Sequence, residues 1–221
     1  MSETYWVPGE PATFATKKER KWKEALQSKM VEVIPRECEG VSFDFVLSTL
    51  APNRQPLDID NLCEPVFSVL SGKLGWFGGR RPNIKYWSAC KSVGENTGVY
   101  IKVSDFEFNM DSKLTVVFDS VYSGVLPKKA TDRNFIDWVE QQVASDIQRR
   151  ERYSMKIEFG GLAVNIGEIA TGKVKPVIDC MVPVIGGKYG TPEDWRIDRL
   201  IVSKGARNLN NGQVRIMIWG N

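Results

Sequence analysis

The sequence repeats a set of landmark residues at a nearly constant spacing, and this repetition limits the possible folds more than any other feature. Trp22 and Trp138, each inside a helical pattern, are 116 residues apart. Three further pairs are 114, 111 and 113 residues apart: Phe45 and Phe159, Pro65 and Pro176, and Lys91 and Lys204. Because the pairs follow in the same order along the chain, they indicate a tandem duplication with small changes in loop length.

Hydrophobic periodicity predicts the same element order in both copies. After a short edge strand near residues 5–7, the first copy is expected to contain a helix over 17–34, a strand over 41–47, a helix from 58 to about 70, and strands over 84–91 and 99–103 joined by a turn. The second copy is expected to contain a strand over 114–118, a helix over 135–150, a strand over 155–159, a helix over 173–181, and paired strands over 197–203 and 214–219.

Each copy therefore reads strand–helix–strand–helix–strand–strand, which predicts an α+β fold with a small mixed or antiparallel sheet. A polar run over 105–113 places the boundary near 104–112, with a first unit over 1–106 and a second over 112–221. Two similar units in one chain are expected to face each other around a pseudo-twofold axis, as a single-chain pseudo-dimer.

The composition excludes several kinds of chemistry. With no histidine in 221 residues, Ser-His-Asp and Cys-His catalysis, histidine general bases and histidine-containing zinc sites are ruled out. The sequence also contains no GxxxxGK[ST] phosphate loop. Any chemistry must then depend on carboxylates, lysines and a metal ion.

The chain carries no sign of secretion or of membrane insertion. The four cysteines lack CxxC spacing, which suggests reduced thiols, and no apolar run approaches 18 residues. We therefore expect a cytoplasmic protein with no membrane partner. A net charge of +3 is too weak to indicate a nucleic-acid partner on its own.

The stretch from Leu57 to Phe67 is the strongest candidate for a functional site. Asp58 and Asp60 alternate with apolar residues, so in an extended backbone their side chains point the same way. A helix is expected to start on Asn61, with Glu64 as the capping-box partner. Paired carboxylates at a helix start suit a hard cation such as Mg²⁺. The alternative is that Asp60 or Asn61 only caps the helix and Asp58 is solvated.

The residues Asp58-Ile59-Asp60-Asn61-Leu62, followed by Pro65 and Leu70, resemble the DxDN-L-x-K-P-x-x-D-x-L helix start of RusA-type Holliday-junction resolvases. The alternating strand over 41–47, the segment 193–197 and the strand-closing Lys204 also fit that family. The resemblance implies a small α+β enzyme, homodimeric in the family, that cuts branched DNA with Mg²⁺ or Mn²⁺. It also implies a site made of an acid pair, a third downstream aspartate and a lysine.

The first unit keeps only part of the family pattern. Asp58 and Asp60 match the acid pair, but Glu64 stands at the lysine position and Ser68 at the helix aspartate. The third acid falls near Arg80-Arg81.

The second unit keeps the complementary part. Ile169 and Thr171 stand where the acid pair is expected, whereas Lys175 and Asp179 match the helix pattern and Asp194 matches the third acid. Neither unit contains a whole site.

Two explanations follow from this division. In the first, one composite site survives, in which Asp58, Asp60 and Asp194 ligate one or two Mg²⁺ or Mn²⁺ ions and Lys175 balances charge on the scissile phosphate. The chain would then be a metal-dependent endonuclease acting on branched or structured DNA, either as a monomeric pseudo-dimer or as a homodimer. In the second, both sites are degenerate and the protein is a DNA-binding or protein-interaction module without nuclease activity. A third class is a structural or inhibitory protein whose acids only cap helices.

Contacts to DNA phosphates are expected from basic residues near the acids. The candidates are Lys73, Arg80, Arg81, Lys85, Lys173, Lys188, Arg196, Arg199, Lys204 and Arg207. The alternative for each is an ordinary solvated charge.

The aromatic residues and cysteines have simpler expected roles. Trp76 and Phe77, in a glycine-flanked loop, either stack on an unpaired base or pack over the sheet. Trp22, Trp138 and Trp219 are expected in the core, and Cys63 and Cys180 are expected to be buried thiols.

Overall fold

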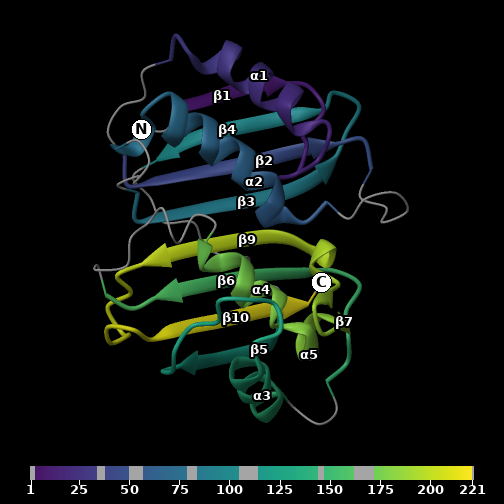
Figure 1. Cartoon of the computed structure of the whole chain (residues 1–221), viewed down its shortest axis with the longest axis vertical. Helices are drawn as coiled ribbons and strands as arrows, with labels where there is room; N and C mark the ends of the chain where they lie inside the picture. Colours follow the sequence, from purple (N-terminus) through teal and green to yellow (C-terminus); the bar gives the residue numbers. More distant parts are fainter. Residues whose placement is uncertain are drawn as a thin grey trace. The chain divides into compact units, whose positions relative to one another are not determined.

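The chain forms two compact units, Met1–Phe108 and Asn109–Asn221, shown in Figure 1. The structure is a computed structural model, and it describes residues 3–33, 38–49, 57–78, 84–104, 114–143, 147–161 and 172–220. The division between the units falls inside the interval 104–112, where the polar run lies in the sequence.

The first unit has the predicted element order. Its elements are β1 (Glu3–Pro8), α1 (Glu19–Met30), β2 (Gly40–Leu47), α2 (Ile59–Phe67), a π-helical turn η1 (Ser68–Lys73), a short 3₁₀ turn η2 (Trp76–Gly78), β3 (Tyr86–Val93) and β4 (Gly98–Ser104). The strands form a mixed sheet in the order β1-β4-β2-β3, in which only β2 and β3 run parallel.

The second unit repeats this plan with one insertion. Its elements are β5 (Thr115–Tyr122), α3 (Arg133–Gln142), β6 (Tyr153–Phe159), α4 (Val174–Asp179), α5 (Val182–Ile185), the hairpin of β7 (Gly187–Lys188) and β8 (Thr191–Pro192), a 3₁₀ turn η4 (Asp194–Arg196), β9 (Ile197–Lys204) and β10 (Val214–Gly220). The order β5-β10-β6-β9 matches that of the first unit, and β6 and β9 form its parallel pair.

The strands of the two units pair in the same register. In the first unit Phe45 lies opposite both Lys91 and Val99. In the second unit Phe159 lies opposite Lys204 and Val214. The pairs Phe45/Phe159 and Lys91/Lys204 therefore occupy equivalent register positions in the four large strands of each unit.

The last two strands of each unit are not paired with each other, contrary to the hairpin that their short connection suggested. In the first unit β2 lies between β3 and β4, and the connection passes the end of β2, where the Gly94 amide donates to the Leu47 carbonyl at 2.9 Å. In the second unit the Gly205 amide donates to the Phe159 carbonyl in the same way. The inner strand β2 buries apolar side chains: Val41, Phe43 and Phe45 are fully buried.

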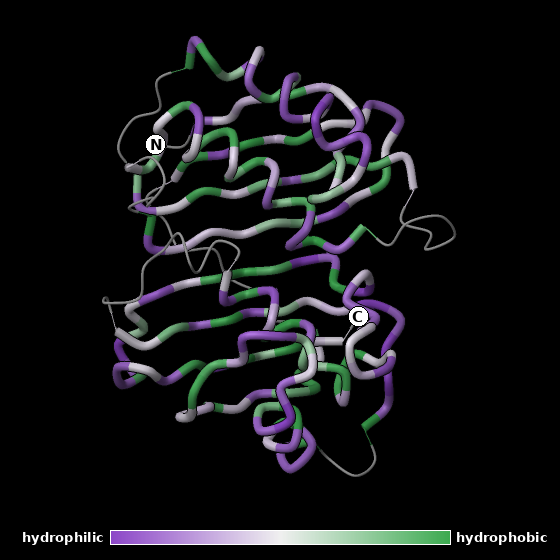
Figure 2. The backbone as a smooth tube through the Cα atoms, in the orientation of Figure 1, coloured by the Kyte–Doolittle hydropathy of each residue, from purple (hydrophilic) through white to green (hydrophobic). Residues whose placement is uncertain are grey.

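The helices of each unit lie across one face of its sheet (Figure 1). In α1 Trp22 is buried as expected, together with Leu26 and Met30 at helical spacing. Phe67 of α2 packs edge-on against Phe43 and Trp87, with ring centroids 5.0 and 5.5 Å apart. Figure 2 shows the hydrophilic residues of α1 interrupted by hydrophobic ones, as this spacing requires.

In the second unit one helix is shorter than predicted and two tryptophans are less buried than predicted. Helix α3 ends at Gln142 rather than at 150, because its buried stripe of Phe135, Ile136 and Val139 ends there and Val143 is extended (ψ 132°). Trp138 and Trp219 are half-buried rather than core residues.

Among the helices that the structure describes, none has both the length and the apolar composition needed to span a membrane.

Candidate functional site

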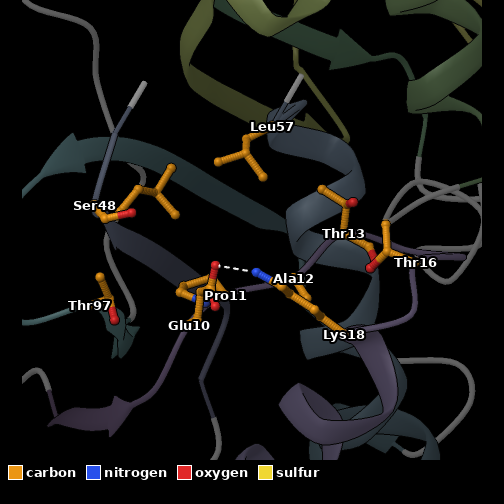
Figure 3. Close-up of a pocket in the computed structure, with 10 residues that line it drawn as sticks. Glu10, Pro11, Ala12, Thr13, Thr16, Lys18, Ser48, Leu57 and Thr97 are labelled. Atoms are coloured by element: carbon orange, nitrogen blue, oxygen red, sulfur yellow. Dashed lines mark hydrogen bonds and ion pairs between the residues drawn. The ribbon is translucent and has the colours of Figure 1, made fainter. Parts of the chain in front are cut away.

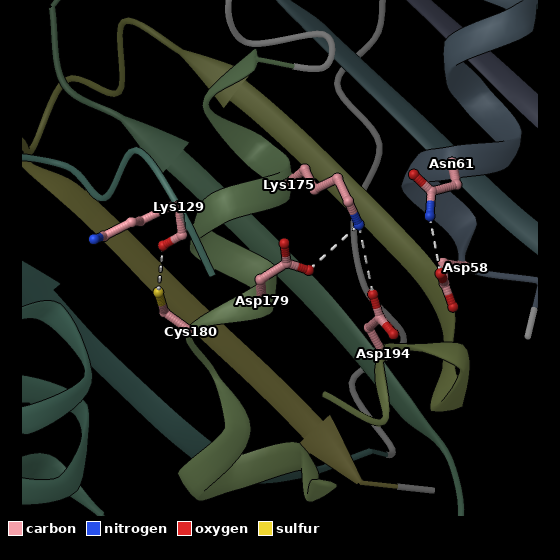
Figure 4. A network of polar contacts seen from close by, with 7 residues as sticks. All are labelled: Asp58, Asn61, Lys129, Lys175, Asp179, Cys180 and Asp194. Carbon is pink, nitrogen blue, oxygen red and sulfur yellow. Dashed lines mark hydrogen bonds and ion pairs between the residues drawn. The ribbon is translucent and has the colours of Figure 1, made fainter. Parts of the chain in front are cut away.

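Helix α2 begins at Ile59, not at Asn61, and Asp58 occupies the N-cap position with an extended backbone (ψ 132°). The Leu62 amide donates to the Asp58 carbonyl at 3.0 Å and closes the first turn. The Asp58 side chain makes no capping bond; its Oδ2 instead accepts a hydrogen bond from Asn61 Nδ2 at 2.9 Å (Figure 4). Asp60 lies inside the first turn, so neither Asp60 nor Asn61 is the cap.

The two carboxylates differ in burial. Asp60 is only 4% exposed, whereas Asp58 is half-buried. Burying an ionised carboxylate costs several kcal/mol unless a positive charge or hydrogen bonds compensate. The groups around Asp60 therefore decide whether its buried charge is compensated.

Lys91, near the end of β3, lies beside this first turn. It is 7% exposed, and its Nζ donates to the Leu57 carbonyl at 3.0 Å. Cys63 lies one turn into α2. Burial raises the pKa of its thiol well above the usual value, the negative charge of Asp60 raises it further, and the positive charge of Lys91 lowers it. Asp60, Cys63 and Lys91 are all buried, and the Lys91 ammonium lies at the backbone just before α2.

Sequence reasoning used Lys91 as a landmark of the repeat but did not include it in the site. The available signal was its position at the carboxyl end of a strand parallel to β2, the edge at which α/β sheets commonly bind ligands. The lysine expected from the family pattern lies in a helix, so this lysine on a strand was overlooked.

A loop covers the other side of the first turn of α2. Pro65 has no N–H, so the Asn61 carbonyl four residues earlier lacks its helical donor. The Phe14 amide donates to that carbonyl at 3.1 Å and holds the loop on the helix.

This loop also lines a small pocket (Figure 3). Thr13 and Thr16 line it together with Ser48, Leu57 and Thr97, and the Lys18–Glu10 ion pair (2.7 Å) lies at its side. Its volume of about 50 Å³ holds a few water molecules at most. We therefore assign it no ligand.

In the second unit the structure brings Lys175 and Asp194 together and adds Asp179. Lys175 Nζ lies 3.3 Å from Asp179 Oδ1 and 3.9 Å from Asp194 Oδ2 (Figure 4). Asp179, one helical turn after Lys175, is 9% exposed, and Asp194, in η4, is 6% exposed. Two buried carboxylates therefore lie beside one ammonium. The i,i+4 spacing of Lys175 and Asp179 was the signal for this contact.

Among the residues that the structure describes, no group of three or more cysteine, aspartate and glutamate side chains is arranged to hold a metal ion. Ile169, Thr171, Arg80 and Arg81 lie outside the described residues.

The remaining basic candidates are in varied surroundings. Lys73 donates to Gln27 at 3.0 Å, and Lys85 pairs with Glu39. Arg196 pairs with Glu193 at 2.8 Å and donates to the Arg150 carbonyl at 2.9 Å, so part of its guanidinium is engaged within the unit. Lys188 and Arg207 are exposed, and Lys173, Arg199 and Lys204 are half-buried.

Trp76 and the two cysteines Cys63 and Cys180 are packed inside their units. Trp76 is 3% exposed and packs edge-on against Tyr5 at 6.0 Å, so it covers the sheet. Cys63 and Cys180 are buried thiols as expected.

Comparison with protein-family models gave no match. Comparison with the curated proteins also gave none.

Proposed function

We propose that the chain is a RusA-like, metal-dependent endonuclease that nicks branched or structured DNA. The observation that carries the proposal is the carboxylate pair at the start of α2, in which Asp60 is buried beside a buried lysine. A charged pair kept in such a place at an energetic cost is typical of a functional site.

The donor set fits Mg²⁺ or Mn²⁺. Asp58 and Asp60 offer carboxylate oxygens, the ligands that hard cations prefer. The hydrogen bond from Asn61 to Asp58 comes from a neutral amide, so it orients the carboxylate without cancelling its charge. When bound, a divalent ion would supply Lewis-acid stabilisation of the scissile phosphate and lower the pKa of the attacking water.

In the first unit, Asp58 and Asp60 are the proposed metal ligands. In the second unit, Asp194 is the proposed metal ligand, and Lys175 offsets charge that develops on a phosphate. The support within the second unit is that Asp194 and Lys175 already lie together in one buried cluster.

DNA contacts come from the basic residues, whose charges attract the phosphate backbone. Lys73, Lys85, Lys173, Lys204 and Arg207 are the described candidates, with Arg196 in a secondary place because its guanidinium is already engaged. Arg80 and Arg81 are proposed from the sequence.

The runner-up function is DNA binding without cleavage. It is favoured by one finding: Lys175 is held by two carboxylates of its own unit, an arrangement in which its charge is already balanced. Cleavage and binding must therefore be measured separately.

The test compares cleavage of a labelled four-way junction and a linear duplex by the full chain, with MgCl₂ or with EDTA. We expect the Asp60→Asn and Asp194→Asn variants each to lose at least about 10- to 100-fold in rate, the loss that is typical even when only an outer-shell partner of a metal ligand is removed. Asp44→Asn is the matched control, because Asp44 lies on β2 with its side chain on the face away from α2, paired to Lys102. It should cleave like the parent chain.

The possible outcomes separate the alternatives. Cleavage that survives Asp60→Asn would overturn the site assignment, and cleavage that survives only Asp194→Asn would confine the site to the first unit. Binding that weakens steeply between 50 and 200 mM salt, without cleavage under any condition, would favour the runner-up.

A further inference from the structure

Lys91 is a buried cation whose ammonium lies at the backbone just before α2, and no step of the proposed reaction uses it. Lysine is almost never buried to this extent unless it is paired. Its 7% exposure and its hydrogen bond to the Leu57 carbonyl fix the ammonium at the backbone that leads directly into Asp58.

The carboxylates of Asp58 and Asp60 give a reason for burying the Lys91 ammonium. Asp60, at 4% exposure, and Lys91 both act electrostatically on the enclosed thiol of Cys63, with opposite signs. Asp58 and Asp60 are separated by one residue, so their like charges would repel each other in a poorly hydrated place. A buried ammonium beside them reduces that repulsion.

We infer that Lys91 is the resident counter-ion of the Asp58/Asp60 pair and a positioning residue for the backbone before Asp58. A divalent cation bound to the same carboxylates would also neutralise their charge, in addition to Lys91. This inference rests on the proposed function only in placing a metal at the acid pair.

The duplication provides a matched control inside the same chain. Lys204 takes the place of Lys91 in the second unit, since Phe45 lies opposite Lys91 and Phe159 lies opposite Lys204. In that unit the sequence positions of the acid pair are Ile169 and Thr171. Removing the Lys204 charge should therefore have no effect linked to a divalent cation.

The experiment measures the thermal unfolding midpoint of the full chain in EDTA and in 10 mM MgCl₂ or MnCl₂. Lys91→Met should lower the midpoint by several degrees in EDTA, and the cation should recover at least half of this loss. Lys204→Met should show the same loss with and without cation, and Lys91→Arg should behave like the parent chain. Asp60→Asn added to Lys91→Met should reduce the loss in EDTA and abolish the recovery.

A loss in Lys91→Met that is equal with and without cation, and unchanged by Asp60→Asn, would overturn the inference and leave Lys91 a purely structural residue. If Lys91→Met does not fold in EDTA, folding rescued by MgCl₂ or by Asp60→Asn supports the inference, and rescue by neither overturns it. This readout does not require cleavage of DNA. If the chain never cuts DNA but shows the cation-linked recovery, the inference stands and the proposed function fails. If the chain cuts DNA but shows no cation-linked recovery, the proposed function stands and the inference fails.

Discussion

At the scale of residues, the notable feature is that each unit encloses ionisable groups. Asp60 and Lys91 lie in the first unit, and Asp179 and Asp194 lie in the second, each at most 9% exposed. Their burial costs free energy that apolar residues of the same size would not. Such groups are therefore the first places to look for function.

The buried thiols give a prediction with a definite sign. Burial raises the pKa of Cys180 to about 11, above the usual 9.0. Between pH 9 and 11 the unfolded chain releases a proton that the folded chain keeps, so the free energy of unfolding should fall by up to about 1.4 kcal/mol per pH unit. Urea denaturation at pH 8 to 11 measures this slope.

The slope should be shallower in Cys180→Ala and unchanged in the control Cys38→Ala, because Cys38 is not buried. At pH 8.5, iodoacetamide should modify Cys38 and Cys90 before Cys63 and Cys180, as read by mass spectrometry. An identical pH slope in Cys180→Ala would contradict the assignment.

At the scale of elements, α2 is held by a bond that its own sequence makes necessary. Pro65 removes one helical donor, and the Phe14 amide replaces it at the Asn61 carbonyl. The proline thereby ties the loop before α1 to the turn that carries Asp60. An interior proline, usually a helix defect, here connects two segments of the first unit.

Replacing Pro65 tests this connection. In Pro65→Ala the new amide competes for the Asn61 carbonyl, so α2 should gain stability while the Phe14 amide loses its acceptor. Hydrogen–deuterium exchange should then become at least about tenfold faster at Phe14, because local opening costs less free energy.

Pro176→Ala is the matched control, because Pro176 lies in the first turn of α4, where an N–H has no helical partner in any case. That variant should leave exchange at Phe14 unchanged. Unchanged exchange at Phe14 in Pro65→Ala would show that another contact holds the loop.

At the scale of the whole molecule, the two units share a topology but have diverged in chemistry. The acid pair belongs to the first unit, and the cluster of Lys175, Asp179 and Asp194 belongs to the second. In the proposed function the chain has one catalytic centre, whereas a symmetric homodimer has two. Cutting both strands of a junction in one encounter needs two centres.

A supercoiled plasmid with an extruded cruciform distinguishes these cases. A single nick releases the supercoiling, the cruciform is reabsorbed, and the product is a nicked circle. We expect nicked circles at all protein concentrations at which the chain is monomeric, and none with Asp60→Asn. Linear plasmid as the first product would show paired cuts, and hence a second centre or a dimer of the whole chain.

The sequence by itself determined the local elements and their repetition. Period and landmark spacing were enough to predict the element order of both units and the burial of Trp22 in α1, because these depend on neighbours within a few residues. The same local information placed the helix start at Asn61, since it cannot show which backbone group closes the first turn.

Only the tertiary structure decided which distant segments meet. Strand order depends on which strand is buried on both sides, so β2 lies between β3 and β4 although β3 and β4 are adjacent in the sequence. The same long-range pairing brings Lys91 to the start of α2 and Asp179 and Asp194 to Lys175. The sequence located the acid pair at Asp58 and Asp60, but its counter-ion comes from a strand that is more than thirty residues away along the chain.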